Sequence, residues 1–278
     1  MTTATCASFS ELLDELVRGL LEELKIDEPP VDTLAVARGL GLEVCPNAAQ
    51  DSRGRIVESR GRVAICVRPE PRSERFHWAV AREIGRYLIP RAADHWPADL
   101  PPADATVLEW LASRFAAHLL APVDWYSADC RRLDHDLIAL KLLYRTASFE
   151  VLALRWLDVR PGSIVTIFDK GRLTRRVSNL EFRTGPPDAC ETACRLEAAR
   201  SGEYAERTEI GVKVRAWPIH QAGWNREILL TERYDFEAAG RRARHDPASE
   251  TSLFVASLDQ GRFTRGSVPA AMRRRFPA

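Results

Sequence analysis

The segment 73–88 places the strongest constraint on how this chain can fold. Ser73 can cap a helix over residues 74–88, and Pro90 is expected to stop it. The sequence REIGR at residues 82–86 sets one glutamate between two arginines in this helix. Residues i and i+4 lie about 40° apart on one helix face, and the residue after the first projects at about 100° from it. The segment therefore presents two guanidinium groups on one face with a carboxylate beside them.

This spacing is the one that zinc peptidases use. Two histidines at such positions hold one Zn²⁺, the glutamate between them activates the bound water, and a third ligand comes from elsewhere in the chain. Here Arg82 and Arg86 stand at the two ligand positions, and only Glu83 is kept. A guanidinium stays protonated and offers no lone pair to a metal. We therefore expect no zinc cofactor and no zinc-dependent peptide hydrolysis.

Other histidines do not restore the site. His77 and His118 should each point about half a turn away from the positions that matter, His77 from the two arginines and His118 from Glu109. His95 follows the helix in a loop, but one histidine and two carboxylates beside two arginines would make a poor zinc site.

Taken alone, a glutamate between two arginines is usually a salt-bridged surface turn.

The flanking sequence changes that interpretation. The segments PPVDTLAVARGLGLEV, RVAICVR, SERFHWAVAREIGRYLI and LEWLASRFAAHLLAPVDWY follow one another over roughly residues 10–160. In order and spacing they resemble the ImmA/IrrE family of metallopeptidase-like proteins. In that family the first motif helix reads A-H-E-x-G-H, and the later helix reads E-x-x-A-N-x-F-A-x-x-L-L-x-P.

The resemblance assigns roles residue by residue. It implies a catalytic base at Glu83, a third metal ligand at Glu109, and histidine positions at Arg82 and Arg86, while Ser113 stands where the family has asparagine. We expect the arginines to pair with Glu83 and Glu109, so that fixed positive charge replaces the metal ion. Such a chain is a catalytically degenerate member of the family.

The resemblance also implies a regulatory role. Family members are linked to stress response, to mobile elements and to cleavage of helix-turn-helix repressors. A degenerate member is expected to bind such a repressor, or another partner or ligand, without cutting it. A residual metallopeptidase with a non-standard site, or hydrolysis that uses Glu83 and Glu109 as paired carboxylates, is an alternative.

The order of expected elements predicts an α+β fold. Helices are expected over residues 9–24, within 31–41 and over 106–120, and a β-hairpin over 55–67. Residues 1–128 form the metallopeptidase-like domain, 129–160 a helix-turn-helix-like extension, and 161–278 a smaller α+β domain that in some relatives is GAF-like and ligand-sensing. Its strands are expected at 164–168, 212–219, 228–231 and 253–258.

A second class of function comes from the helices expected over residues 134–144 and 148–157. Their helix-turn-helix outline would suit a DNA-binding transcriptional regulator. The second helix, however, carries only Arg155 among apolar residues, whereas a recognition helix needs polar and basic side chains. Direct DNA binding is therefore the less favoured interpretation.

Composition adds few further constraints. The 278 residues carry a formal charge of +1, so no global field attracts the chain to nucleic acid or to an anionic membrane. No apolar stretch approaches the roughly 18 residues that span a bilayer, and the N-terminus has no signal-peptide pattern, so we expect a cytoplasmic protein.

Two minor features remain. The six cysteines are scattered and are expected to be free, with Cys190 and Cys194 as small apolar positions on one helix face. Trp217, His220 and Trp224 are candidates for the lining of a ligand pocket in the C-terminal domain.

Overall fold

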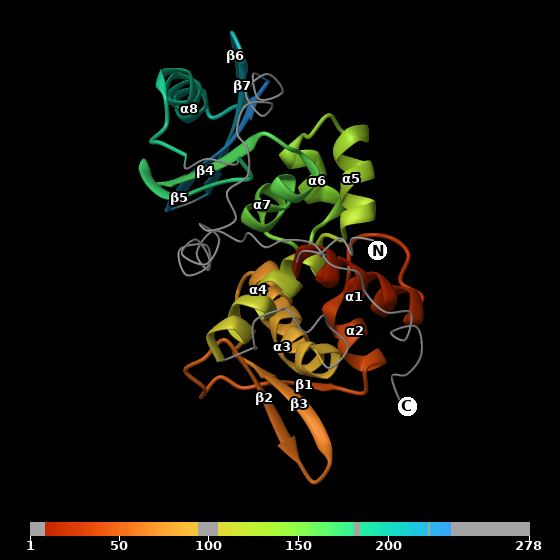
Figure 1. Ribbon diagram of the computed structural model, residues 1–278. Coiled ribbons are helices and arrows are strands. Elements are labelled where there is room, and N and C mark those ends of the chain that lie inside the picture. Colours follow the sequence, from red (N-terminus) through yellow and green to blue (C-terminus); the bar gives the residue numbers. More distant parts are fainter. Residues whose placement is uncertain (1–8, 94–104, 181–183, 222, 235–278) are drawn as a thin grey trace, which may run out of the picture. The chain divides into compact units, whose positions relative to one another are not determined.

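The computed structural model describes residues 9–93, 105–180, 184–221 and 223–234 (Figure 1). They fall into two compact units, one up to residue 148 and one from residue 149 onward. The described residues form eight helices, a three-stranded sheet and a five-stranded sheet, which confirms the predicted α+β class. None of these helices has the length and apolar content that crossing a bilayer requires.

The first unit is mainly helical. Its helices are α1 (Phe9–Glu23), α2 (Thr33–Gly39), α3 (Ser73–Ala93), α4 (Ala105–Leu120), α5 (Val123–Arg132) and α6 (Leu137–Leu143). Helix α1 buries Leu13, Leu20 and the other apolar residues of one face, and it packs on α4, which in turn packs on α3. Asp32 caps α2 by accepting the N–H of Leu34, in agreement with the expected start of that helix.

A small sheet packs against α3. Its strands β1 (Glu43–Pro46), β2 (Gly54–Ser59) and β3 (Arg62–Val67) lie in the order β1-β3-β2 (Figure 1). The predicted hairpin is present, with positive φ at both residues of the Arg60-Gly61 turn, as the right-handed strand twist favours. The parallel partner β1 has only four residues, one of them proline, and was not predicted.

Helix α3 runs past the expected stop. It was predicted to end at Leu88, but Pro90 lies inside it and the helix continues to Ala93. A proline removes one backbone N–H and bends the helix, but it need not end it when the residues around it stay buried. Ile89 is fully buried and Ala92 is almost so, and Arg91 bonds the carbonyl of Tyr87. The gain from burying the last turn therefore outweighs the lost hydrogen bond.

Helix α6 starts later than expected. Asp134 and His135 both have positive φ, which a right-handed helix cannot include. Asp136 then caps the helix by accepting the N–H of Ile138. The helix expected from residue 134 therefore begins at Leu137.

The second unit is a five-stranded antiparallel sheet with one helix on each face. Its elements are α7 (Phe149–Val159), β4 (Ser163–Asp169), β5 (Arg172–Ser178), α8 (Ala189–Ser201), β6 (Ala205–Glu209), β7 (Val212–Gln221) and β8 (Trp224–Arg233). The strand order is β5-β4-β8-β7-β6. The three expected strands that lie in the described residues are confirmed. The strand expected at 253–258 lies outside the described residues.

Alternate residues of the sheet face different helices. Val214, Ala216 and Leu229 form a buried cluster with Cys194 of α8, whereas Trp217 faces the other way. The ring of Trp217 lies 5.2 Å from that of Trp156 on α7. Helix α7 is therefore part of the second unit, whereas the sequence had suggested that residues 129–160 form a helical segment of their own. The boundary falls between α6 and α7.

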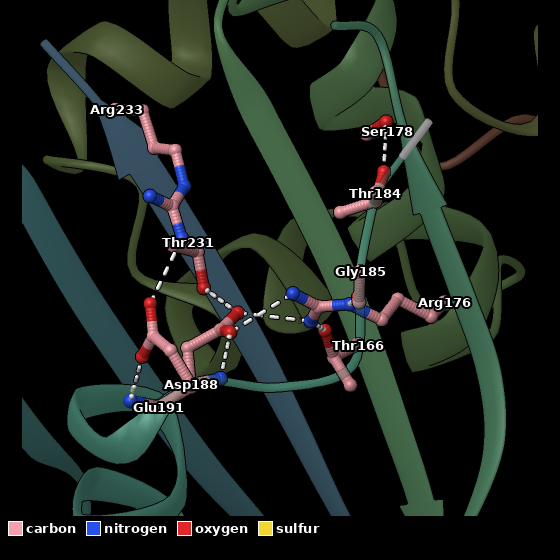
Figure 2. A network of polar contacts seen from close by, with 9 residues as sticks. All are labelled: Thr166, Arg176, Ser178, Thr184, Gly185, Asp188, Glu191, Thr231 and Arg233. Atoms are coloured by element: carbon pink, nitrogen blue, oxygen red, sulfur yellow. Dashed lines mark hydrogen bonds and ion pairs between the residues drawn. The ribbon is translucent and has the colours of Figure 1, made fainter. Parts of the chain in front are cut away.

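A buried ion pair joins α8 to this sheet (Figure 2). Glu191 is fully buried and accepts two hydrogen bonds of 2.9 Å from the guanidinium of Arg176 on β5. Thr231 on β8 donates to the same carboxylate at 2.6 Å, and Arg176 also bonds Thr166 and the carbonyl of Gly185. Each charged atom of the pair has a partner, which is the condition for burying charge at low cost.

The same glutamate helps to begin α8. Asp188 accepts the N–H of Glu191, and the Glu191 carboxylate accepts the N–H of Asp188, so the two residues form a capping box (Figure 2). Arg233 donates to Asp188 at 2.8 Å. Glu191 thus ties the helix start and strands β5 and β8 together.

Glu191→Gln should lower the free energy of unfolding of the second unit by about 3 kcal/mol, because it leaves the buried charge of Arg176 without its counterion. Hydrogen exchange of the β4 and β8 amides measures this locally. Glu197→Gln is the matched control, since it breaks an exposed pair with Arg207 and should cost less than about 1 kcal/mol. Equal losses in the two variants would contradict the assignment.

Candidate functional site

The two helices that carry the sequence motif, α3 and α4, lie against each other and bring its charges together. Arg82 and Arg86 of α3 each donate to one carboxylate oxygen of Glu109 on α4. Arg86 also donates to Glu83 across 3.2 Å, one helix turn away. Two guanidinium groups thus face two carboxylates, and the formal charge of the cluster is zero. The pairing expected from the sequence is confirmed.

The cluster has a buried end and an open end. The side chain of Glu83 is only 1% exposed, whereas 39% of the Glu109 side chain is exposed. Burial raises the pKa of Glu83, and the neighbouring Arg86 and Arg82 oppose this effect. Arg86 bonds both carboxylates, whereas Arg82 bonds that of Glu109. The side chains of Arg82 and Arg86 are 32% and 27% exposed. The charges are therefore accessible from the Glu109 side.

Two glycines permit close packing of α3 against its neighbours. A Cβ atom on Gly85 would lie 2.9 Å from the ring of Phe115, so the glycine of the motif lets α3 approach α4. A Cβ on Gly54, at the start of β2, would lie 2.9 Å from Cγ of Glu83. The side chain of Glu83 is thus held between its own helix and the edge strand of the small sheet. Real Cβ atoms do not approach other atoms this closely without a shift in the structure.

The other candidate residues of the first unit lie elsewhere. His77 bonds Thr33 of α2 at 2.9 Å, and burial lowers the pKa of its ring. His118 is fully buried and bonds Asp14 of α1 at 2.7 Å. His77 thus points away from the arginines and His118 away from Glu109, as expected, and His95 lies outside the described residues. The hydroxyl of Ser113 donates to the backbone carbonyl of Glu109, one turn earlier in α4.

The donor set does not fit a zinc ion. Arg82 and Arg86 present guanidinium groups, which have no lone pair for a metal, and these groups bind the Glu109 carboxylate. Among the described residues no group of three or more histidine, cysteine, aspartate or glutamate side chains is arranged to hold a metal. The contacts that these four side chains make are ion pairs and hydrogen bonds.

The pocket candidates of the second unit do not converge. Trp217 and His220 lie three positions apart on β7 and so face opposite sides of the sheet. His220 approaches Glu227 at 3.2 Å, while the ring of Trp224 is covered by the guanidinium of Arg226. Trp217 and Trp224 share a face, but their places in the register lie four residues, or about 13 Å, apart.

Two features of the structure were not found in the sequence. One is the Arg176–Glu191 pair, for which the only local signal is Asp188 three residues before Glu191, the spacing of a capping box. The other is a cavity of about 390 Å³ between α1 and α5, with the Arg18–Asp124 ion pair among its lining. Its lining shares no residue with the arginine cluster.

Comparisons with known proteins identify a similar fold among solved structures. No protein family model matches the chain, and no curated protein matches it. Among solved structures it is similar to a protein described as a Mycobacterium tuberculosis transcriptional regulator, with a TM-score of 0.60 and 15% sequence identity. The match covers 86% of this chain and 82% of the other. At this identity the likeness establishes a shared fold.

Gly85→Ala should lower the free energy of unfolding of the first unit by about 1–3 kcal/mol, because the added methyl group meets Phe115. Gly19→Ala is the control: it lies exposed within α1 with no atom near its Cβ, and should raise stability by about 0.5–1 kcal/mol. Urea denaturation followed by circular dichroism compares them. A stabilising Gly85→Ala would contradict the close approach of the two helices.

Glu83 should make folding pH-dependent. The pKa of Glu83 is raised in the folded protein, so as pH rises the unfolded chain loses the Glu83 proton at a lower pH than the folded chain does. The contribution of Glu83 to the free energy of unfolding therefore falls as pH rises from about 4 through the folded pKa. Glu83→Gln should remove this contribution to the slope of stability against pH, whereas Glu58→Gln, which changes an exposed residue of β2, should leave the contribution in place. Urea midpoints measured across that range test this, and an unchanged slope in Glu83→Gln would refute it.

Proposed function

We propose that this protein is a catalytically degenerate ImmA/IrrE-type metallopeptidase-like regulator that acts by binding a partner rather than by hydrolysing peptides. The observation that carries the proposal is the binding of Glu109 by both Arg82 and Arg86. These are the positions that the family resemblance assigns to the metal ligands. A cluster with its own internal counterions has no need of a metal to balance its carboxylates.

The retained scaffold supports a binding role. Gly54 lets β2 pack against Glu83, and Gly85 lets α3 pack against Phe115 of α4, although the histidines are absent. Two arginines paired with one carboxylate at a partly exposed site can bind a partner, which supports a retained use of this region. The fold likeness to a described transcriptional regulator is compatible with a role in transcription.

The partner that we propose is a helix-turn-helix repressor or another regulatory protein. Relatives in the resembled family act on such repressors in stress response and in the control of mobile elements. A chain that keeps the fold and the glutamates, but carries arginines in place of the ligands, would hold the repressor without cutting it. The second unit would then serve as a ligand-sensing or partner-binding module.

Direct DNA binding through residues 134–157 is the less favoured alternative. Arg155 is the only basic residue of α7, yet its side chain is 1% exposed and bonds Asp158 at 2.6 Å. Leu152, Ala153 and Trp156 of the same helix are fully buried. A recognition helix needs exposed polar and basic side chains for bases and phosphates. This composition favours a packing role for α7.

The metal content of the purified protein tests the loss of zinc chemistry. We expect no stoichiometric zinc in the unaltered protein, and zinc binding in the Arg82→His/Arg86→His variant, where two imidazoles would join Glu109. Arg75→His/Arg91→His adds the same number of histidines to the ends of α3 and should bind none. Stoichiometric zinc in the unaltered protein would overturn the proposal.

The binding role needs its own test. The purified protein is mixed with a helix-turn-helix repressor encoded in the same genome, and complex formation is followed by light scattering. We expect a stable complex in which mass spectrometry finds the repressor intact, with or without added Zn²⁺. Cleavage of the repressor would show a residual peptidase. Binding of the protein alone to duplex DNA, weakening as salt rises, would favour the DNA-binding alternative.

A further inference from the structure

Two cysteines stand side by side on the small sheet of the first unit. Strands β1 and β3 pair in parallel, and their register sets Cys45 directly opposite Cys66. Both thiols are free and both are partly exposed. They lie 21 positions apart in the sequence, so only the pairing of the strands brings them together.

Both side chains project from the outer face of the sheet. Ile65 and Val67 of β3 are fully buried, so Cys66 between them must point the other way. Cys45 is its register partner and lies on the same face. Neighbouring strands lie about 4.8 Å apart, and a disulfide accepts Cα separations of roughly 4.4–6.8 Å. The two residues therefore meet the main distance requirement for a covalent bridge.

We propose that Cys45 and Cys66 form a reversible disulfide, which makes the outer face of the β1-β3-β2 sheet a thiol oxidation site. The inference rests on strand register and exposure, and it does not depend on the function proposed above. A low-molecular-weight disulfide such as oxidised glutathione is the class of oxidant.

The reaction proceeds by two exchanges. The thiolate of Cys66 attacks one sulfur of the glutathione disulfide, which forms a mixed disulfide and releases one glutathione thiolate. The thiolate of Cys45 then attacks the Cys66 sulfur, forms the protein disulfide and releases the second glutathione. Two electrons pass from the protein to the oxidant, and the two thiol protons end on the two released glutathiones. Reduction by excess glutathione reverses both steps.

The local charges favour this order. Burial and the nearby Glu43 carboxylate raise the pKa of the Cys45 thiol, so it is the poorer first nucleophile. Once the mixed disulfide forms at Cys66, Cys45 needs only to attack a sulfur in the neighbouring position.

The other described cysteines are poor competitors. Cys130 of α5 is buried, and Cys190 and Cys194 lie on the buried face of α8. Burial raises the pKa of Cys190 to about 11 and that of Cys194 to about 12. A buried thiol with so high a pKa offers almost no thiolate to an oxidant.

The bridge would close a loop that includes β2. This loop contains Gly54, which packs against Glu83, so oxidation would restrain the strand that borders the arginine cluster. Loop closure in the unfolded chain stabilises the folded unit. The oxidised protein is expected to melt roughly 5 °C higher than the reduced protein.

The test uses the full chain carrying Cys6→Ser, which removes the one thiol outside the described residues. The protein is equilibrated in glutathione buffers of increasing oxidised fraction, remaining thiols are alkylated, and the bridge is located by peptide mass mapping. We expect a loss of two hydrogen atoms, a crosslinked peptide that joins Cys45 to Cys66, and full reversal by dithiothreitol. Added Cys45→Ser or Cys66→Ser should each abolish the bridge, while Cys190→Ser should leave it unchanged.

Three results would overturn the proposal. They are a bridge mapped to other cysteines, separate glutathione adducts on Cys45 and Cys66 without a bridge, or both thiols still alkylated after exposure to fully oxidised glutathione. Both positions are partly exposed, so we expect serine to be accommodated at each. Circular dichroism of each serine variant checks that it folds.

Discussion

The contact of Glu109 with two guanidinium groups holds together the two central helices of the first unit and balances their charges. It joins α3 to α4 at the point where Gly85 lets the helices approach, and it balances the two charges that α3 carries on one face. Without Glu109, Arg82 would lose the carboxylate that it bonds, and Arg86 would keep its bond to Glu83. The contact thus contributes both to helix packing and to charge balance.

The second unit uses the same chemistry in a different setting. Glu191 and Arg176 form a bidentate pair whose carboxylate is fully buried and further bonded by Thr231 and by a backbone N–H. Glu109, by contrast, has 39% of its side chain exposed. A saturated pair that solvent does not reach can only support the fold, whereas a partly open pair can exchange one of its bonds for a bond to a partner. Exposure, rather than the kind of residue, separates the structural ion pair from the candidate site.

Local patterns predicted much of this structure because they act over a few residues. Helical sequence patterns predicted α2 within residues 31–41 and the end of α4 at Leu120, and the spacing of Arg82, Glu83 and Arg86 predicted their shared environment. The failures involve tertiary context. Burial of Ile89 carried α3 through Pro90, and strand β1 exists only because β3 pairs with it. The partners of Arg176 come from separate segments, so no local pattern could join them.

The balance of charges around Glu109 also bears on how such a site can change over generations. The two arginines act as a unit, since each satisfies one oxygen of the same carboxylate. Replacing one of them by histidine would leave two carboxylates facing a single permanent cation, with Glu83 already 1% exposed, and would still provide too few ligands for a metal. A single exchange of arginine for histidine would therefore lose the balanced charges without gaining a metal site. The effects of changing Arg82 and Arg86 should accordingly be non-additive.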